Sequence, residues 1–169
     1  MTMLDLSTLL RNSRGAAAVE MALVAPLLVV IMFGSFELGN YFYDNHIVVK
    51  SVRDGARFAS RQKFASYTCP TTVSSAVIDS TRNVTRTGQT GAGGTPRLYN
   101  WTNESTITVS LSCTENSTQT YSGIYVGHAD VPVVRVSAVV PYGSLFSVIG
   151  FNSTALTIRA ESEVPVMGI

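Results

Sequence analysis

The longest apolar run of the chain extends from Ala16 to Phe36, and Glu20 is the only charge among these 21 residues. A helix of roughly 20 apolar residues crosses the hydrocarbon core of a bilayer. The run therefore predicts a membrane-spanning helix over residues 16–36. Pro26 lies inside it and removes one backbone donor, which membrane helices tolerate with a kink.

The helical pattern continues beyond the apolar run, now with one packing face and one water-facing side. This predicts an amphipathic extension over residues 37–68, with the helix itself reaching about Gln62. Cys69-Pro70 is the expected stop, because a residue before proline avoids the helical region. The packing positions are Leu38, Tyr41, Phe42, Val48, Val49, Val52, Ala56 and Ala59, and the water-facing ones are Asp44, Asn45, Lys50, Arg53, Asp54, Arg57 and Arg61.

The pattern of apolar and polar positions over residues 69–169 predicts a small α+β domain. "TTVSSAVIDSTRNV" has a weak helical pattern with a Thr or Ser cap, and the glycine-rich stretch Thr85 to Pro96 reads as a loop. Apolar and polar residues then alternate in "STITVSLSC", "VPVVRVSAVV" and "TALTIRAESEV", as in half-buried strands. "SLFSVIGF" is expected to form a helical turn over the sheet. The predicted fold class is α+β, with a long helix laid on a small antiparallel sheet.

Charge and candidate chemistry exclude several classes of function. The net charge is +1, and the only two lysines, Lys50 and Lys63, form no basic block, so no nucleic-acid partner is expected. His46 and His128 have no metal-ligand spacing with the cysteines. The glycine-rich loop lacks the ending of a P-loop, and no G-x-S-x-G motif occurs. We therefore expect no metal, no cofactor and no enzymatic activity.

Basic residues on one side of the apolar run predict its orientation. Arg11 and Arg14 precede the run, which favours a cytoplasmic N-terminus and an outward-facing C-terminal domain. A cleaved secretory signal peptide is the competing interpretation, but the run is longer than the usual 7–15 residues and no A-x-A site follows Phe36. An uncleaved signal anchor remains open.

The two cysteines, Cys69 and Cys113, both follow the membrane segment. In an oxidising compartment one disulfide would close a loop of about 45 residues, worth roughly 3–4 kcal/mol in the loop-entropy model. Two free buried thiols are the alternative.

The residues "RGAAAVEMALVAPLL" resemble the class III signal of the type IV pilin superfamily, and most closely that of TadE-like minor pilins or pseudopilins of tight adherence (Tad/Flp) systems. Such signals have a basic leader, a glycine at the cut and a glutamate five residues into the mature chain. Here Arg14-Gly15 precede Ala16, and Glu20 is the fifth residue counted from Ala16. Met21 departs mildly from the large apolar residue usual after the glutamate.

Two further segments contribute to the resemblance. "FELGNYFYDNHIVVKSVRDGARFAS" contains an Arg-x-Gly-Ala-Arg-like motif from Arg53 to Arg57, and "TALTIRAESEV" ends with an Arg-x-Glu-like pair, Arg159 and Glu161. The likeness is dense over residues 14–60 and thin from 70 to 130.

The resemblance implies a pilin-like subunit with a cytoplasmic leader, residues 1–15, that a prepilin peptidase removes between Gly15 and Ala16. Glu20 would then pair with the new N-terminal amine of a neighbouring subunit, because opposite charges relieve each other's cost in a low-dielectric layer. The implied location is the bacterial inner membrane, and the implied partners are the peptidase, other pilins and pseudopilins, and the Tad assembly platform.

Three alternatives stay open at this point. Glu20 could instead reach the inner headgroups as an ordinary snorkelling side chain. The chain could be an uncleaved, membrane-anchored scaffold or binding module of the periplasm. A secreted enzyme with a signal anchor is the third, although the sequence shows no catalytic cluster.

Overall fold

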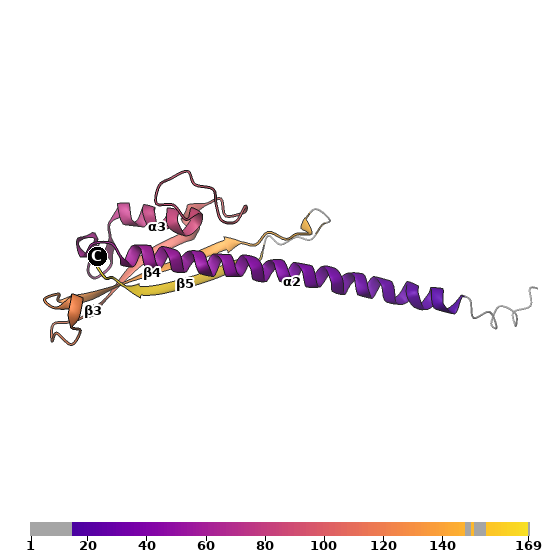
Figure 1. The fold of residues 1–169 in the computed structure, drawn as a ribbon, viewed down its shortest axis with the longest axis horizontal. Coiled ribbons are helices and arrows are strands. Elements are labelled where there is room, and N and C mark those ends of the chain that lie inside the picture. Colours follow the sequence, from indigo (N-terminus) through magenta and orange to yellow (C-terminus); the bar gives the residue numbers. More distant parts are fainter. Residues whose placement is uncertain (1–14, 148–149, 151–154, 169) are drawn as a thin grey trace, which may run out of the picture. The chain divides into compact units, whose positions relative to one another are not determined.

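A computed structural model describes residues 15–147, 150 and 155–168 (Figure 1). Helix α2, Ala16–Ser60, is the longest element, and Pro26 lies within it. The chain divides into two compact units, Met1–Asn40 and Tyr41–Ile169, so that α2 contributes to both. The predicted leader, residues 1–14, lies outside the described residues.

In the C-terminal unit, Tyr41–Ile169, α2 buries one stripe of small, apolar and polar side chains. Asp44 is buried in this stripe, so its prediction as a water-facing residue was wrong. Phe42 and Leu38 were assigned to the packing face and are instead more than half exposed, at 59% and 55%. Asp44 lies on the buried face because it is four residues before Val48. The stripe also uses Gly55 to approach Thr85 closely, and hydrophobicity alone does not mark such positions. The buried residues of α2 are Asp44, Val48, Ser51, Val52, Gly55, Ala56, Ala59 and Ser60.

Helix α2 ends at Ser60, within two residues of the expected end near Gln62, and the 3₁₀ turn and short strand that follow occupy the rest of the segment before Cys69-Pro70. Its final carbonyl groups are taken by donors from outside the helix. The Tyr67 hydroxyl donates to the Ala59 carbonyl, and the Met167 amide donates to the Ser60 carbonyl at 2.6 Å. Such tertiary caps satisfy the acceptors that a helix end leaves open.

Short elements connect α2 to the next helix. A 3₁₀ turn, η1, covers Phe64–Ser66, and the two-residue strands β1, Tyr67–Thr68, and β2, Thr72–Val73, pair antiparallel. Helix α3 spans Ser75–Thr87, which confirms the helix expected there. Gly88 ends it in the left-handed conformation, with φ of 79° and its amide bonded to the Val84 carbonyl, as a C-terminal glycine cap does.

The main sheet has three antiparallel strands in the order β3-β4-β5 (Figure 1). After the 3₁₀ turn η2, Glu104–Thr106, come β3, Ile107–Glu115, then β4, Asp130–Pro141, and β5, Thr157–Pro165. The alternation predicted for these segments is confirmed, since residues such as Val134 and Val136 are buried and the intervening Arg135 is exposed. Leu156 was expected on the buried face, but it precedes β5 and is 53% exposed.

Both helices cover the same apolar face of this sheet. Val48, Val52 and Ala56 of α2 form one cluster with Trp101 and with strand residues such as Ile107. A second cluster joins Ala59 of α2 and Val77 of α3 to Leu111 and Val134. The predicted α+β fold class is confirmed. Of the turn expected over "SLFSVIGF", only residues 144–147 and 150 are described, so its remainder lies outside the described residues.

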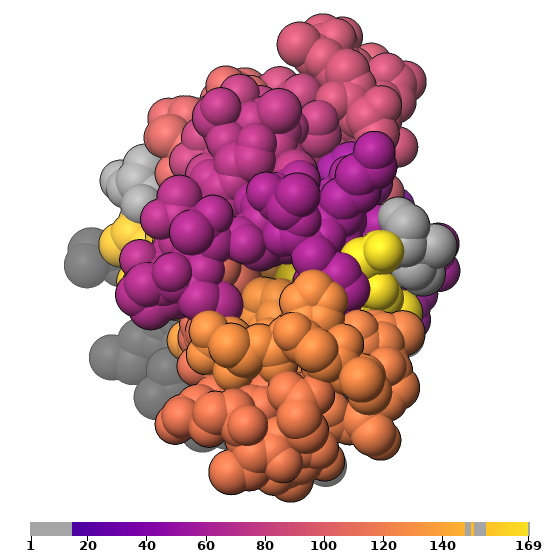
Figure 2. Space-filling model, turned by 90° about the vertical axis from the view of Figure 1, so that its left-hand side faces the viewer, coloured from indigo at the N-terminus to yellow at the C-terminus, as the bar shows by residue number. Residues whose placement is uncertain are grey.

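The connection from β3 to β4 is ordered by one buried amide. Asn116 is fully buried, and its Nδ2 donates to the carbonyls of Tyr121, Tyr125 and His128, each at 3.2 Å. Phe64, just after α2, lies 4.5 Å from the His128 ring, measured between ring centroids. Figure 2 looks onto this end of the C-terminal unit, where the residues after α2 (purple) and the β3–β4 connection (orange) form one surface.

Candidate functional site

The start of α2 presents the three residues that the sequence singled out for processing and assembly. Gly15 forms a turn, its carbonyl accepts from the Val19 amide at 3.1 Å, and α2 begins at Ala16. Glu20 lies four positions after Ala16, so the two residues occupy the same helix face on successive turns. Gly15, Ala16 and Glu20 are all exposed. Arg11 and Arg14 lie outside the described residues.

Around these residues, no other part of the described chain covers the apolar surface of α2. Among the described residues α2 is the one helix long and apolar enough to cross a membrane, and none of its most apolar window is buried. Met21, Leu23 and Leu27 are each at least 60% exposed. The Ser35 hydroxyl donates to the Ile31 carbonyl at 2.8 Å, which satisfies this polar group within the helix itself. The prediction of a membrane-anchored protein fits this geometry.

The Arg53–Arg57 motif divides its residues between opposite sides of α2. Gly55 and Ala56 are buried, whereas Arg53 and Arg57 are exposed. Gly55 lies against α3, since a Cβ placed on it would be 2.0 Å from the Thr85 hydroxyl oxygen. Glycine at this position thus lets the two helices approach closely.

Asp54, in the middle of the same motif, is held by an arginine from a loop. Its Oδ2 accepts from Arg97 Nη1 at 2.9 Å, and the same nitrogen donates to the Ser51 hydroxyl at 3.2 Å. The Arg97 and Asp54 side chains are 25% and 32% exposed. This partly buried pair fastens the segment before β3 to α2. The sequence did not indicate a role for Arg97, because nothing local to it signals a partner 43 positions away.

Asp44 was also missed as a buried acid. Its exposure is 5%, and burial raises the pKa of its carboxyl above the ordinary value of 3.8. Its place in the sequence carried a usable signal, because Asp44 lies four residues before Val48 and eight before Val52, both buried. The helical period alone therefore puts it in the packing stripe.

On β5, Arg159 and Glu161 of the Arg-x-Glu-like motif form no ion pair with each other. Arg135 of β4 instead lies between two glutamates of β5. Its Nη1 is 3.8 Å from Glu161, and Nε and Nη2 both contact Glu163. These groups are on the exposed face of the sheet, where such pairs contribute little to stability. Arg159 is exposed and has no ion pair among the described residues.

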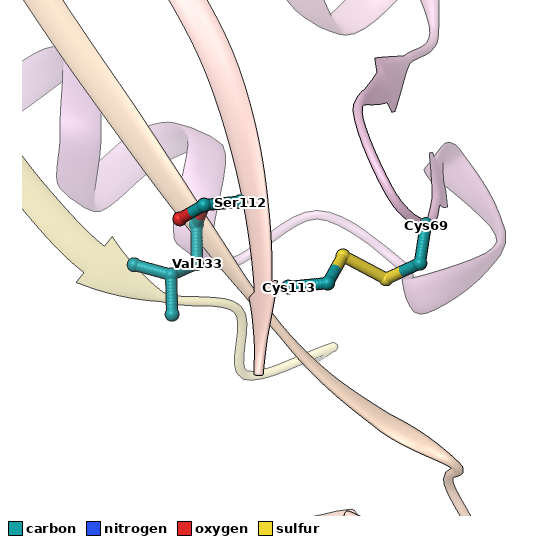
Figure 3. Close-up of a disulfide and its surroundings, with 4 residues drawn as sticks. All are labelled: Cys69, Ser112, Cys113 and Val133. Atoms are coloured by element: carbon teal, nitrogen blue, oxygen red, sulfur yellow. A yellow bond between two sulfur atoms is a disulfide. The ribbon is translucent and has the colours of Figure 1, made fainter. Parts of the chain in front are cut away.

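The structure joins Cys69, which follows β1, to Cys113 of β3 (Figure 3). Their Cα atoms are 5.9 Å apart. In Figure 3 the Cys113 side chain points toward Cys69, while the neighbouring Ser112 points the other way. The Ser112 hydroxyl donates to the Val133 carbonyl at 3.4 Å. The disulfide therefore links the segment after α2 to an edge strand of the main sheet.

Neither histidine belongs to a group of side chains that could bind a metal ion among the described residues. His46 is exposed on α2, and His128 packs its ring on Phe64. Within residues 15–147, 150 and 155–168, no three His, Cys, Asp or Glu side chains gather as metal ligands would.

Fold and exposed helix together define an α+β protein with a candidate membrane-spanning helix in its N-terminal part. Residues 15–57 match the family model described as TadE-like protein, which confirms the resemblance over this segment. Over these residues the chain is similar to that family. The match runs from Gly15 to Arg57 and so includes both Glu20 and the Arg53–Arg57 motif. No curated protein and no solved structure matches the chain.

Proposed function

We propose that the chain is a minor pilin-like subunit of a Tad/Flp-type adhesive pilus, cut by a prepilin peptidase between Gly15 and Ala16. The observation that carries this proposal is the spacing of Gly15 and Glu20 at the exposed start of α2, within the TadE-like segment. The proposed role is structural, so the chain is the substrate of an enzyme and not itself one.

The proposed location follows from the helix and the leader charges. The apolar part of α2 anchors the chain in the inner membrane, Arg11 and Arg14 keep the leader in the cytoplasm, and the C-terminal unit lies in the periplasm. Its proposed partners are the peptidase, other pilin and pseudopilin subunits, and the Tad assembly platform. The disulfide between Cys69 and Cys113 suits an oxidising compartment.

Glu20 supplies the proposed contact between subunits. Cleavage after Gly15 would create an amine on Ala16, and a carboxylate in the apolar layer gains from pairing with such an amine on a neighbour. Glu20 is exposed along α2 and so is available to a second helix. Pairing at this point would fix the register of one subunit against the next.

The testing experiment is mass spectrometry of the N-terminus of the membrane-extracted protein, with the peptidase gene present and deleted. The expected mature chain begins at Ala16 only when the peptidase is present. Gly15→Val should block processing by crowding the scissile bond. Because nothing lies within 4 Å of a Cβ at Gly15, the substitution does not clash within the chain itself.

Gly34→Val is the matched control, since Gly34 also lies in α2 with nothing within 4 Å of an added Cβ. This variant should be processed normally. An intact leader in wild-type membranes that contain active peptidase would favour the uncleaved, membrane-anchored module instead.

A further inference from the structure

A line of cations follows the exposed side of α2 in the C-terminal unit. Lys50, Arg53, Arg57 and Arg61 are spaced three or four positions apart, and all four are exposed. Such spacing puts side chains on one face of a helix, and Arg61 directly follows the helix end. We call these four residues the basic stripe.

The chain does not neutralise the basic stripe. Among the described residues, no carboxylate oxygen lies within 4.0 Å of a stripe nitrogen. Asp54, the acid nearest in sequence, is occupied by Arg97 at 2.9 Å, and Asp44 is buried. Like charges four positions apart on a helix repel each other. The stripe is therefore an unfavourable feature of the isolated chain that an acidic partner would relieve.

The same chain carries an acidic surface that is equally unneutralised. Glu115 of β3 and Asp130 of β4 are directly opposite each other at the end of the ladder. Neither has an ion pair among the described residues, although the Glu115 carboxylate accepts from the Ser117 hydroxyl at 2.7 Å. Like charges directly opposite each other weaken a strand pair. By contrast, five other acids of the described residues each have an arginine within 4.0 Å: Asp54, Asp79, Glu104, Glu161 and Glu163.

We propose that the basic stripe of one copy binds the Glu115–Asp130 surface of a second copy of this chain. Because the two surfaces are different, one copy can bind the next head-to-tail, and this contact can then repeat from copy to copy. Three of the four stripe residues are arginines, whose planar guanidinium groups match carboxylates well. The inference deepens the proposed assembly role and rests on it, and it assigns to the Arg53–Arg57 motif a contact between subunits.

The test uses the full-length chain in detergent micelles, prepared in two isotopic forms and mixed. A carbodiimide joins amines to carboxylates without a spacer, so it can link Lys50 to Glu115 or Asp130. We expect cross-linked peptides that carry both labels, which only two different copies can give. Arg57→Glu should lower their yield by about tenfold or more, since like charges at an interface are strongly disfavoured.

Arg159→Glu is the matched control, because it makes the same charge change at an exposed residue of β5 that has no ion pair among the described residues. It should leave the mixed-label yield unchanged. Copies with Arg57→Glu should also cross-link again when they are mixed with copies carrying Asp130→Lys, because the charges are then complementary in the opposite sense.

Three results would overturn the proposal: links confined to one label, an equal loss in Arg159→Glu, or no recovery in the charge-swapped mixture. Binding to vesicles of anionic phospholipid that Arg57→Glu abolishes, without mixed-label links, would assign the stripe to lipid headgroups instead. The chain could also form mixed-label links and yet never be processed or found in pili. That result would contradict the proposed function but would still support the contact between two copies.

Discussion

Gly55 of α2 lies so close to Thr85 of α3 that an added Cβ would be 2.0 Å from the threonine hydroxyl oxygen and 3.2 Å from its Cβ. Both residues are buried, and the Thr85 hydroxyl donates to the Thr81 carbonyl at 2.7 Å. Glycine thus sets the separation of the two helices at this point.

Gly55→Ala is expected to destabilise the C-terminal unit by roughly 1–3 kcal/mol, the usual cost of overpacking a filled core. The free energy of unfolding can be measured by fluorescence of the full chain in micelles, because Trp101 is the only tryptophan and is fully buried. Gly39→Ala is the control, since nothing lies within 4 Å of a Cβ there. Thr85→Ala added to Gly55→Ala should recover part of the loss. Equal effects at Gly55 and Gly39 would contradict the close approach.

Removal of the disulfide should lower stability by about 3–4 kcal/mol, because Cys69 and Cys113 are 44 positions apart and the bridge restricts the unfolded chain. The comparison is between the wild type and Cys69→Ser/Cys113→Ser in denaturant, again through Trp101. A reductant should destabilise the wild type and leave the double variant unchanged. A non-reducing peptide map of periplasmic material that shows both cysteines as free thiols would reject the bridge.

Asp44 should make stability depend on pH in a direction opposite to that of an ion-paired acid. Burial raises its pKa in the folded chain above 3.8, so the folded state holds this proton more tightly than the unfolded state does. Protonated Asp44 therefore contributes its full stabilisation when the pH is below the pKa of Asp44 in the unfolded chain. This stabilisation is lost as the pH rises through the pKa of Asp44 in the folded chain.

Asp44→Asn removes this titration. At neutral pH the variant should be more stable than the wild type, by about 1.4 kcal/mol for each unit of raised pKa. The difference should shrink as the pH is lowered toward 4, and unfolding curves of both proteins at several pH values would show it. Asp79→Asn is the control, because Asp79 is an exposed acid of α3, with 70% of its side chain accessible. If the free energy of unfolding differed between the Asp44 variant and the wild type by the same amount at every pH, Asp44 would not have a raised pKa in the folded chain.

Glu20→Ala should permit membrane insertion and cleavage but impair incorporation into the pilus. Insertion is expected because the change removes a charge from the apolar segment, and cleavage because Gly15 and the leader are intact. Leaving one charge of a buried pair without its partner costs about 3–5 kcal/mol, less near the interface. Fractionation into precursor, mature membrane form and sheared surface material would locate the defect.

Glu20→Asp keeps the charge and should restore part of the incorporation. Normal recovery of Glu20→Ala in the pilus fraction would refute the pairing, even where processing at Gly15 proceeds as proposed. A snorkelling carboxylate predicts that outcome, since it contributes little to contacts between subunits.

The strands were predictable because each is buried on one face only. In β4, Val134, Val136 and Ala138 alternate with Arg135 and Ser137, and this period survives in the folded sheet. The N-terminal helix was predictable because its apolar run, with Glu20 as the only charge, is long enough for a membrane-spanning helix. Gly15 and Glu20 were singled out through the resemblance to pilin signals, in which a glycine precedes a glutamate by five residues.

Other features depend on partners that are remote in sequence, so local patterns missed them. The end of α2 at Ser60 is fixed by Tyr67 and Met167, and Asp54 is held by Arg97. Arg135 contacts Glu161, which the sequence had associated with Arg159, and also Glu163.

The cap on Ser60 has a consequence for the order of events during biosynthesis. The Met167 amide that completes the end of α2 follows every helix and strand of the described chain, and β5 just before it completes the sheet. The ribosome therefore delivers the membrane segment first and the final closure last. Until residues 157–167 have been synthesised, the sheet that α2 packs on lacks its last strand and the end of α2 lacks its cap. A nascent chain paused before that point would leave β4 as an open edge strand, and such incomplete sheets are exposed to aggregation and proteolysis until the last strand pairs.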